Sequence, residues 1–191
     1  MPIAPDPAPE PDARVTFEIR PATPADVASF VELLRQVAGE GRYIRTEKVN
    51  QSRRFYRRLF RRSWTPSEAT IVAMDGRRVI GQLHVAREDQ PATRHVASLR
   101  MVVAAEWRGR GVGTALMAEA IRWAREAGVE KLSLSVYPDN DAARALYAKF
   151  GFEDEGRLSG HSKKTIGYRD EILMGLWLIP KPDGSGSPGG P

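Results

Sequence analysis

Residues 108–114 read Arg108-Gly109-Arg110-Gly111-Val112-Gly113-Thr114 and connect an apolar segment, Val96–Val103, to an amphipathic one, Thr114–Ala127. The first segment predicts a strand, and the helical spacing of the second predicts a helix that ends at Gly128. A glycine-rich turn at the start of a helix exposes unpaired N–H groups and the positive end of the helix dipole, which favours a bound phosphate. The spacing matches neither the Rossmann nor the P-loop motif, so neither a dinucleotide nor ATP is the first expectation. The alternative is a tight turn whose glycines serve packing alone.

A second segment downstream, residues 136–152, reads VYPDNDAARALYAKFGF. Together the two segments resemble the GNAT superfamily of N-acetyltransferases. The first matches its signature [Q/R]-x-x-G-x-[G/A] through Arg108, Gly111 and Gly113. The second matches N-x-x-A-x-x-L-Y-x-x-x-G-F through Asn140, Ala143, Leu146, Tyr147, Gly151 and Phe152. The predicted elements follow the family's order over nearly all of residues 16–179.

Working outward from these segments, the chain alternates between strand and helix patterns. The expected elements, in chain order, are a strand at Val15–Arg20, a helix from Pro24 to Val37 capped by Thr23 and Asp26, a helix at Glu47–Arg62, strands at Ala69–Met74, Val79–Ala86 and Val96–Val103, a helix at Thr114–Ala127, a strand at Lys131–Val136, a helix at Asp141–Phe150, and strands at Phe152–Leu158 and Tyr168–Ile179. Asp75-Gly76 predicts a hairpin between two of these strands. We expect an α/β (α+β) fold in which about four helices flank a mixed, mostly antiparallel sheet of roughly six to seven strands.

Composition limits the classes of protein that fit. The 191 residues suffice for one domain, placed at residues 14–179, and the Pro-rich residues 1–13 and the Gly/Pro/Ser-rich residues 180–191 are expected to be disordered tails. No apolar run approaches the roughly 18 residues of a membrane span, and residues 1–14 do not read as a secretory signal. There is no cysteine and only three histidines, so we expect no metal site and a cytoplasmic protein.

The resemblance implies that acetyl-CoA is the cosubstrate and that the strand ending at Met101-Val102-Val103 splays from its neighbour to admit it. The turn at Arg108, Gly109, Arg110, Gly111, Val112, Gly113 and Thr114 would hold the pyrophosphate, and Asn140 and Arg144 would also contact the cosubstrate. Tyr147 would lie near the thioester sulfur and act as general acid, since a phenol can protonate the departing thiolate. Its alternative role is to pack a ring on the sheet.

The acceptor amine and its base are less well defined. Many relatives carry a carboxylate in the strand before the signature, but His95–Met101 contains none. The remaining base candidates are Glu40, Glu47, His84, Asp170 and Glu171, or water. The resemblance places Gly39–Thr46 over the acceptor, so Tyr43 would shape that pocket, while Glu40 and Glu47 would select a cationic amine. The positive charges of Arg42 and Arg45 instead suit an acceptor that also bears a carboxylate or phosphate.

We therefore expect transfer of an acetyl group to the primary amine of a small, amino-acid-like acceptor by direct attack, with a protein or peptide amine as the alternative. A different class, a nucleic-acid-associated module, would use the arginines of residues 53–62; residues 42–62 hold nine basic side chains and one acid. We expect those arginines to form a solvated helix face and nucleic acid not to be a partner, because no nucleic-acid-binding motif accompanies them. A third reading, an acetyl-CoA-binding protein without catalysis, disagrees with the presence of Tyr147 and Asn140. The segment Glu171–Ile179 has apolar residues on both faces, which predicts a strand buried on both sides or one that pairs across a dimer, and we expect a homodimer.

Overall fold

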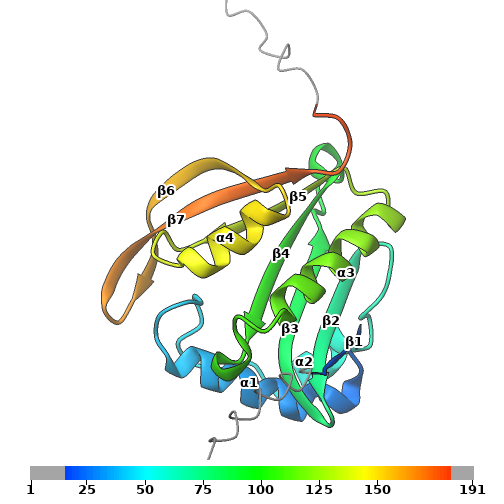
Figure 1. Cartoon of the computed structure of the whole chain (residues 1–191), viewed down its shortest axis with the longest axis vertical. Coiled ribbons are helices and arrows are strands. Elements are labelled where there is room, and N and C mark those ends of the chain that lie inside the picture. The colour runs from blue at the N-terminus through cyan, green and yellow to red at the C-terminus, as the bar shows by residue number, and fades with distance from the viewer. Residues whose placement is uncertain (1–15, 182–191) are drawn as a thin grey trace, which may run out of the picture.

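The computed structural model describes residues 16–181, which form a single seven-stranded sheet with helices on both faces (Figure 1). Its strands are β1 (Glu18–Pro21), β2 (Glu68–Asp75), β3 (Arg78–Arg87), β4 (Val96–Val103), β5 (Lys131–Val136), β6 (Glu153–Lys164) and β7 (Gly167–Trp177). Its α-helices are α1 (Val27–Gly39), α2 (Arg53–Phe60), α3 (Val112–Glu126) and α4 (Asp141–Lys149), and three short 3-10 turns cover Pro24–Asp26, Pro91–Thr93 and Ala105–Trp107. The expected fold class is confirmed.

The strands lie in the order β1-β2-β3-β4-β5-β7-β6, and all neighbours are antiparallel except β4 and β5. The parallel pair is hydrogen-bonded only where Val96–Ser98 faces Lys131–Ser133. Beyond that point the two strands separate, as Figure 1 shows, and the sheet opens into two arms. The expected splay of these strands is confirmed, and it leaves a space in the middle of the sheet.

Two hydrophobic cores stabilise the sheet, one on each face. On one face α3 covers β2, β3 and β4, and its buried Leu116, Met117 and Trp123 belong to the larger core. On the other face α1 and α2 form a smaller core through Phe30, Tyr56, Phe60 and their neighbours. Because side chains alternate across a strand, β2, β3 and β4 contribute side chains to both cores.

Several local sequence signals have the expected structural effect. Thr23 and Asp26 form the predicted capping box before α1, and Arg20 holds Asp26 through two hydrogen bonds of 2.8 Å. Desolvation of Asp26 would raise its pKa, but the bonds from Arg20 and Thr23 outweigh it and lower the pKa below its usual value. Asp75-Gly76 makes the β2–β3 hairpin, where Gly76 has a φ of 55°.

The second helix is shorter than the sequence predicts. Helix α2 begins at Arg53, after the side chain of Ser52 caps the N–H of Phe55, whereas the arginine and apolar pattern predicted a helix from Glu47. Residues 47–52 are not helical: Ser52 has an extended backbone as the N-cap of α2. Glu47 accepts bonds from the backbone N–H and hydroxyl of Thr165 in the β6–β7 turn. The strand expected at residues 168–179 is β7, which lies inside the sheet between β5 and β6. It is therefore an interior strand, and the homodimer stays a prediction.

Two expectations concern residues at the ends of the chain. The disordered tails predicted at residues 1–13 and, apart from its first two residues, 180–191 lie outside the described residues. Within residues 16–181, no helix has the length and apolar character that a membrane crossing requires.

Candidate functional site

A cavity of about 930 Å³ occupies the opening between β4 and β5 and extends onto the α1/α2 face of the sheet. On one side it is bordered by the glycine-rich turn, the start of α3 and the helix α4. On the other side it is bordered by α1, α2, the segment before α2 and the strands β3 and β4. We call the first side the donor half and the second the acceptor half.

The donor half contains the start of α3, where Gly111 is the N-cap residue with a left-handed φ of 85°. The first N–H groups of a helix have no partner within the helix, so those at the start of α3 are available beside the cavity. Gly113 allows α4 to pack close by, because a Cβ at this position would lie 2.9 Å from Cδ2 of Leu146. The helix begins at Val112, two residues before the predicted start, so the turn and the helix N-terminus are one feature.

Arg108 is committed to protein contacts. Its guanidinium forms a bidentate ion pair with Glu40 at 2.7 and 2.8 Å, donates to the carbonyl of Val103 and stacks over the ring of Tyr43. Arg108 therefore joins the end of β4 to the segment after α1. The sequence places both Glu40 and Arg108 in a site, but it contains no signal that they pair, because 67 residues separate them along the chain.

Asn140 and Arg144, the two residues of the downstream segment expected to contact the cosubstrate, have different environments. Asn140 lines the cavity, and its side-chain oxygen accepts a 3.3 Å bond from the N–H of Ala143, which caps α4. Arg144 is not among the lining residues; it pairs with Asp154 at 3.2 Å, and its Nε is buried without a hydrogen-bond partner in residues 16–181.

Tyr147 lies in the wall of the donor half and is 7% exposed. Its ring packs against Phe152 at a centroid distance of 5.8 Å. Burial raises the pKa of Tyr147 to about 12, so its hydroxyl keeps its proton at neutral pH. Tyr147 thus contributes a protonated phenol to the wall of the donor half.

The acceptor half has a polar floor formed by Gln82, His84 and Arg100, on the sheet face that α1 and α2 cover. Nδ1 of His84 lies 3.0 Å from the hydroxyl of Thr70. Desolvation, with a smaller effect from Arg100, lowers the pKa of His84 to about 4, so the imidazole is neutral at pH 7. Tyr43 also lines the cavity, as the sequence analysis expected.

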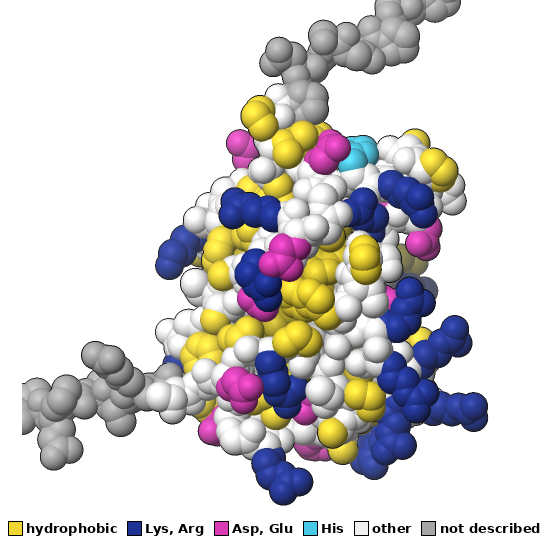
Figure 2. All heavy atoms as spheres, turned by 90° about the vertical axis from the view of Figure 1, so that its right-hand side faces the viewer, with side chains coloured by type: hydrophobic (Ala, Val, Ile, Leu, Met, Phe, Trp, Pro, Cys, Tyr) yellow, Lys and Arg dark blue, Asp and Glu magenta, His cyan; other side chains and the backbone are white. Residues whose placement is uncertain are grey.

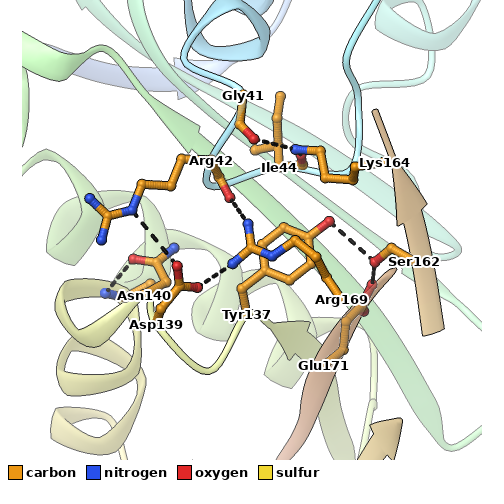
Figure 3. Close-up of polar contacts among 11 residues, drawn as sticks. Gly41, Arg42, Ile44, Tyr137, Asp139, Asn140, Ser162, Lys164, Arg169 and Glu171 are labelled. Carbon is orange, nitrogen blue, oxygen red and sulfur yellow. Dashed lines mark hydrogen bonds and ion pairs between the residues drawn. The ribbon is translucent and has the colours of Figure 1, made fainter. Parts of the chain in front are cut away.

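A buried carboxylate, Glu171, forms part of the cavity wall near the hairpin of β6 and β7. Arg45 donates to it with Nε at 2.7 Å and with Nη2. The hydroxyl of Ser162 donates to it at 2.6 Å and also contacts Tyr137 (Figure 3). Desolvation would raise the pKa of Glu171, but these hydrogen bonds outweigh it and lower the pKa to about 2. Sequence reasoning named Glu171 but not this network, whose members come from four distant segments.

The remaining acidic base candidates are also engaged. Glu40 is paired with Arg108 and Glu47 with Thr165, and neither lines the cavity. Asp170 accepts bonds from Arg157 and from the N–H of Gly160. Across residues 16–181, no cluster of three or more His, Asp or Glu side chains is arranged to bind a metal ion.

Comparison with known proteins identifies a family. The sequence model described as the acetyltransferase (GNAT) family matches residues 41–152, which is more than half of the chain. The L-amino acid N-acetyltransferase AaaT of Escherichia coli is 34% identical over 108 residues, covering 54% of this chain and 64% of that protein. The chain therefore spans less than two thirds of this curated relative.

Solved structures agree with the fold over a larger part of the chain. An acetyltransferase of the GNAT family from Streptococcus pneumoniae is 26% identical with a TM-score of 0.80, covering 86% of this chain and 100% of that one. A ribosomal-protein-alanine N-acetyltransferase from Brucella melitensis is 28% identical with a TM-score of 0.76, covering 84% and 99%.

Proposed function

Because the chain belongs to the acetyltransferase (GNAT) family, we propose that it transfers an acetyl group from acetyl-CoA to the primary amine of a small, amino-acid-like acceptor. The observation that carries this proposal is the single cavity that joins the start of α3, the hydroxyl-bearing Tyr147 and the polar floor of the acceptor half. The N–H groups at the start of α3 would hold the pyrophosphate, and the gap between β4 and β5 would admit the pantetheine arm.

The reaction is a direct attack, in which the acceptor nitrogen bonds to the thioester carbon and the C–S bond breaks. The electron pair of that bond leaves with sulfur, and the amine loses one proton. Tyr147 remains protonated because burial raises its pKa to about 12, so it can donate a hydrogen bond as charge develops on sulfur. Backbone N–H groups near Val103 would polarise the thioester carbonyl.

Water is the proposed carrier of the proton that leaves the amine. The imidazole and the carboxylate that line the cavity are poor bases, because the pKa of His84 is lowered to about 4 and that of Glu171 to about 2. A general base works best when its pKa lies near the working pH. Solvent in the cavity, rather than either side chain, would therefore accept the proton.

The names of two similar proteins point to different acceptors, one to a small molecule and one to a protein. The Escherichia coli relative is an L-amino acid N-acetyltransferase, which favours a small acceptor. The Brucella structure is that of a ribosomal-protein-alanine N-acetyltransferase, so a protein N-terminus remains the second candidate. The charged and polar floor of the acceptor half favours the small molecule, because it offers contacts close to the reacting amine.

Turnover of acetyl-CoA with a panel of free amino acids, simple amines and peptides tests this proposal. We expect CoA release with amino acids and acetyl-CoA-dependent thermal stabilisation of the protein. Turnover with peptides alone would favour the protein acceptor. If acetyl-CoA binds but no amine is acetylated, the protein binds acetyl-CoA without catalysis, and the proposed activity is overturned. Light scattering of the same sample measures the proposed homodimer.

The competing class of function is a nucleic-acid-binding module, which the arginines on and directly after α2 would support. All six arginines at positions 53, 54, 57, 58, 61 and 62 are exposed, and Figure 2 shows basic side chains gathered at the lower right edge, on the side where α2 lies. Arginine stems also cover apolar surface on an ordinary solvated helix. We expect no salt-dependent binding of duplex DNA or RNA at two ionic strengths; binding that weakens steeply with salt would favour the module.

A further inference from the structure

The polar floor of the acceptor half contains hydrogen-bonding groups that the protein itself does not use. No hydrogen bond is made by the side chains of Gln82 or Arg100 to any part of residues 16–181, and Arg100 has no carboxylate within ion-pair distance there. Gln82 is nevertheless only 6% exposed. The amide atoms of Gln82 are not among the buried side-chain atoms left without a partner in residues 16–181, so they reach the open space of the cavity. The amide of Gln82 and the guanidinium of Arg100 are therefore available to an occupant of the floor.

The sheet register places these groups side by side. Arg100 in β4 faces His84 in β3, and Val102 faces Gln82, so Arg100 and Gln82 are diagonal neighbours on the same face. Arg100 directly precedes Met101, which borders the gap where the thioester would lie. An anionic group held by Arg100 would therefore be close to the attacking amine.

The charges of the cavity determine which group fits. Glu171 is the acid among the lining residues, and Arg45 and Ser162 already satisfy it. Arg108 is neutralised by Glu40, and the imidazole of His84 is neutral at pH 7. Arg100 thus leaves the acceptor half with an unbalanced positive charge, which favours a carboxylate and disfavours a second ammonium.

The wall opposite the floor is apolar. Phe30 and Leu34 come from α1, and Phe55, Tyr56 and Leu59 come from α2. Phe55 is 48% exposed, one of few large apolar side chains in residues 16–181 that the fold leaves open. An apolar group of the acceptor would cover it.

On the basis of the proposed function, we propose that the acceptor is an α-amino acid with an apolar side chain, whose carboxylate is bound by Arg100 and Gln82 and whose side chain packs on Phe55 and its neighbours. Arg100 is then the residue that selects a carboxylate beside the amine. This assignment replaces the expected selection of a cationic amine by Glu40 and Glu47, whose carboxylates point to protein partners.

The test compares leucine or phenylalanine with the matching amino acid amide, the decarboxylated amine and the aminophosphonate, using the wild type, Arg100→Gln and the control Arg77→Gln. Arg77 is exposed in the β2–β3 turn and is not among the residues that line the cavity. For the wild type we expect kcat/KM for the amino acid to exceed that for the amide and the amine by about 10- to 100-fold, the value of a lost charged hydrogen bond.

Arg100→Gln should raise KM for the amino acid by about the same factor, leave the amide and the amine nearly unchanged, and preserve acetyl-CoA-dependent thermal stabilisation. Arg77→Gln should behave as the wild type. Equal rates for amino acid, amide and amine in the wild type, or an Arg100→Gln loss that is equal for all acceptors, would overturn the proposal while the acetyltransferase stands. A higher kcat/KM for the aminophosphonate than for the amino acid would mean that Arg100 selects a phosphonate, and it would overturn the proposal that the acceptor bears a carboxylate. If no amine is acetylated, the proposed function itself fails. Binding of a carboxylate by Arg100 is then tested alone: N-acetylleucine should stabilise the wild type against heat, and Arg100→Gln should remove that stabilisation.

Discussion

Tyr147 combines two properties that are rarely found together away from a functional site. Its ring is buried against Phe152, yet the residue also lines the cavity. A residue that served packing alone would lose nothing if the hydroxyl were removed. The substitution that removes only the hydroxyl therefore separates the two roles.

Tyr147→Phe should leave the free energy of unfolding and the affinity for acetyl-CoA nearly unchanged and lower kcat by roughly 10- to 1,000-fold. The loss should shrink with an acyl donor whose leaving thiol is more acidic, because that thiolate needs less stabilisation. Steady-state kinetics with both donors measure the effect, and Tyr168→Phe, at a position 70% exposed, is the control. An unchanged kcat with chemistry rate-limiting would mean that Tyr147 only packs.

His84 makes the stability of the fold depend on pH. Its pKa is about 4 in the folded protein, below the ordinary value of 6.5, mainly because burial disfavours the charged ring. As the pH falls below about 6.5, the unfolded chain takes up a proton that the folded chain does not, so the free energy of unfolding falls until about pH 4. The loss amounts to at most about 3 kcal/mol.

His84→Asn should remove this pH dependence, and urea unfolding at about pH 7 and about pH 4.5 measures it. The exposed His161→Asn should retain the wild-type slope. The Glu171 carboxylate acts in a lower window, since its pKa falls from about 4.5 to about 2 and its contribution is lost only as the pH falls through that range. A wild type as stable at about pH 4.5 as at about pH 7 would contradict the role of His84.

The start of α3 is the element on which donor binding depends. Gly111 has a left-handed φ of 85°, a conformation that other residues adopt only with strain, and a Cβ there would point into open space rather than into a neighbour. Any effect of a side chain at this position therefore reflects the backbone conformation and what occupies the open space.

Gly111→Val should cost about 1–2 kcal/mol of stability through backbone strain and reduce the affinity for acetyl-CoA by a larger factor, because the side chain would occupy the anion's approach. Calorimetric titration with acetyl-CoA measures the second effect and chemical unfolding the first. Gly76→Val, which has a φ of 55° in the β2–β3 turn, is the matched control for strain without a ligand. Equal acetyl-CoA affinity in both variants would place the pyrophosphate elsewhere.

Most elements follow from the sequence because their signals are local. Strands β4 and β5 have the predicted bounds, and α1 and α4 begin at or near their capping residues. The start of α2 was predicted wrongly at Glu47, although the arginine and apolar pattern begins only at Ser52, the residue that caps the helix. Glu47 contacts Thr165, which is 118 residues away in sequence, and no local signal shows that contact. The polar floor was partly readable, since Gln82, His84 and Arg100 occupy the face-alternating positions of two strands. It was not readable that His84 bonds to Thr70 while Gln82 and Arg100 have no hydrogen-bond partner within residues 16–181.

At the scale of the whole molecule, the segment between α1 and α2 is fastened to the β6–β7 hairpin. Lys164 donates to the carbonyls of Gly41 and Ile44 at 2.7 and 2.9 Å, and Arg169 donates to that of Arg42 and stacks on Tyr137 (Figure 3). Arg45 makes its ion pair with Glu171 from the same segment. These contacts join the two arms of the sheet across the opening of the cavity, so the acceptor half keeps its shape only while the segment stays in place.

Lys164→Met tests this connection, because methionine keeps most of the apolar stem of a side chain that is 5% exposed and removes both hydrogen bonds. Two carbonyls then lose their partners, at a cost of about 1–3 kcal/mol that falls on the segment rather than on the core. We expect faster amide exchange in residues 41–47, a KM for the acceptor raised about 3- to 30-fold, and an unchanged affinity for acetyl-CoA, whose site is in the other half of the cavity. The exposed neighbour Lys163→Met should change none of these quantities. If exchange in residues 41–47 accelerates while the KM for the acceptor stays constant, the segment does not shape the acceptor half, and the α1–α2 side of the cavity must be held by the helices alone.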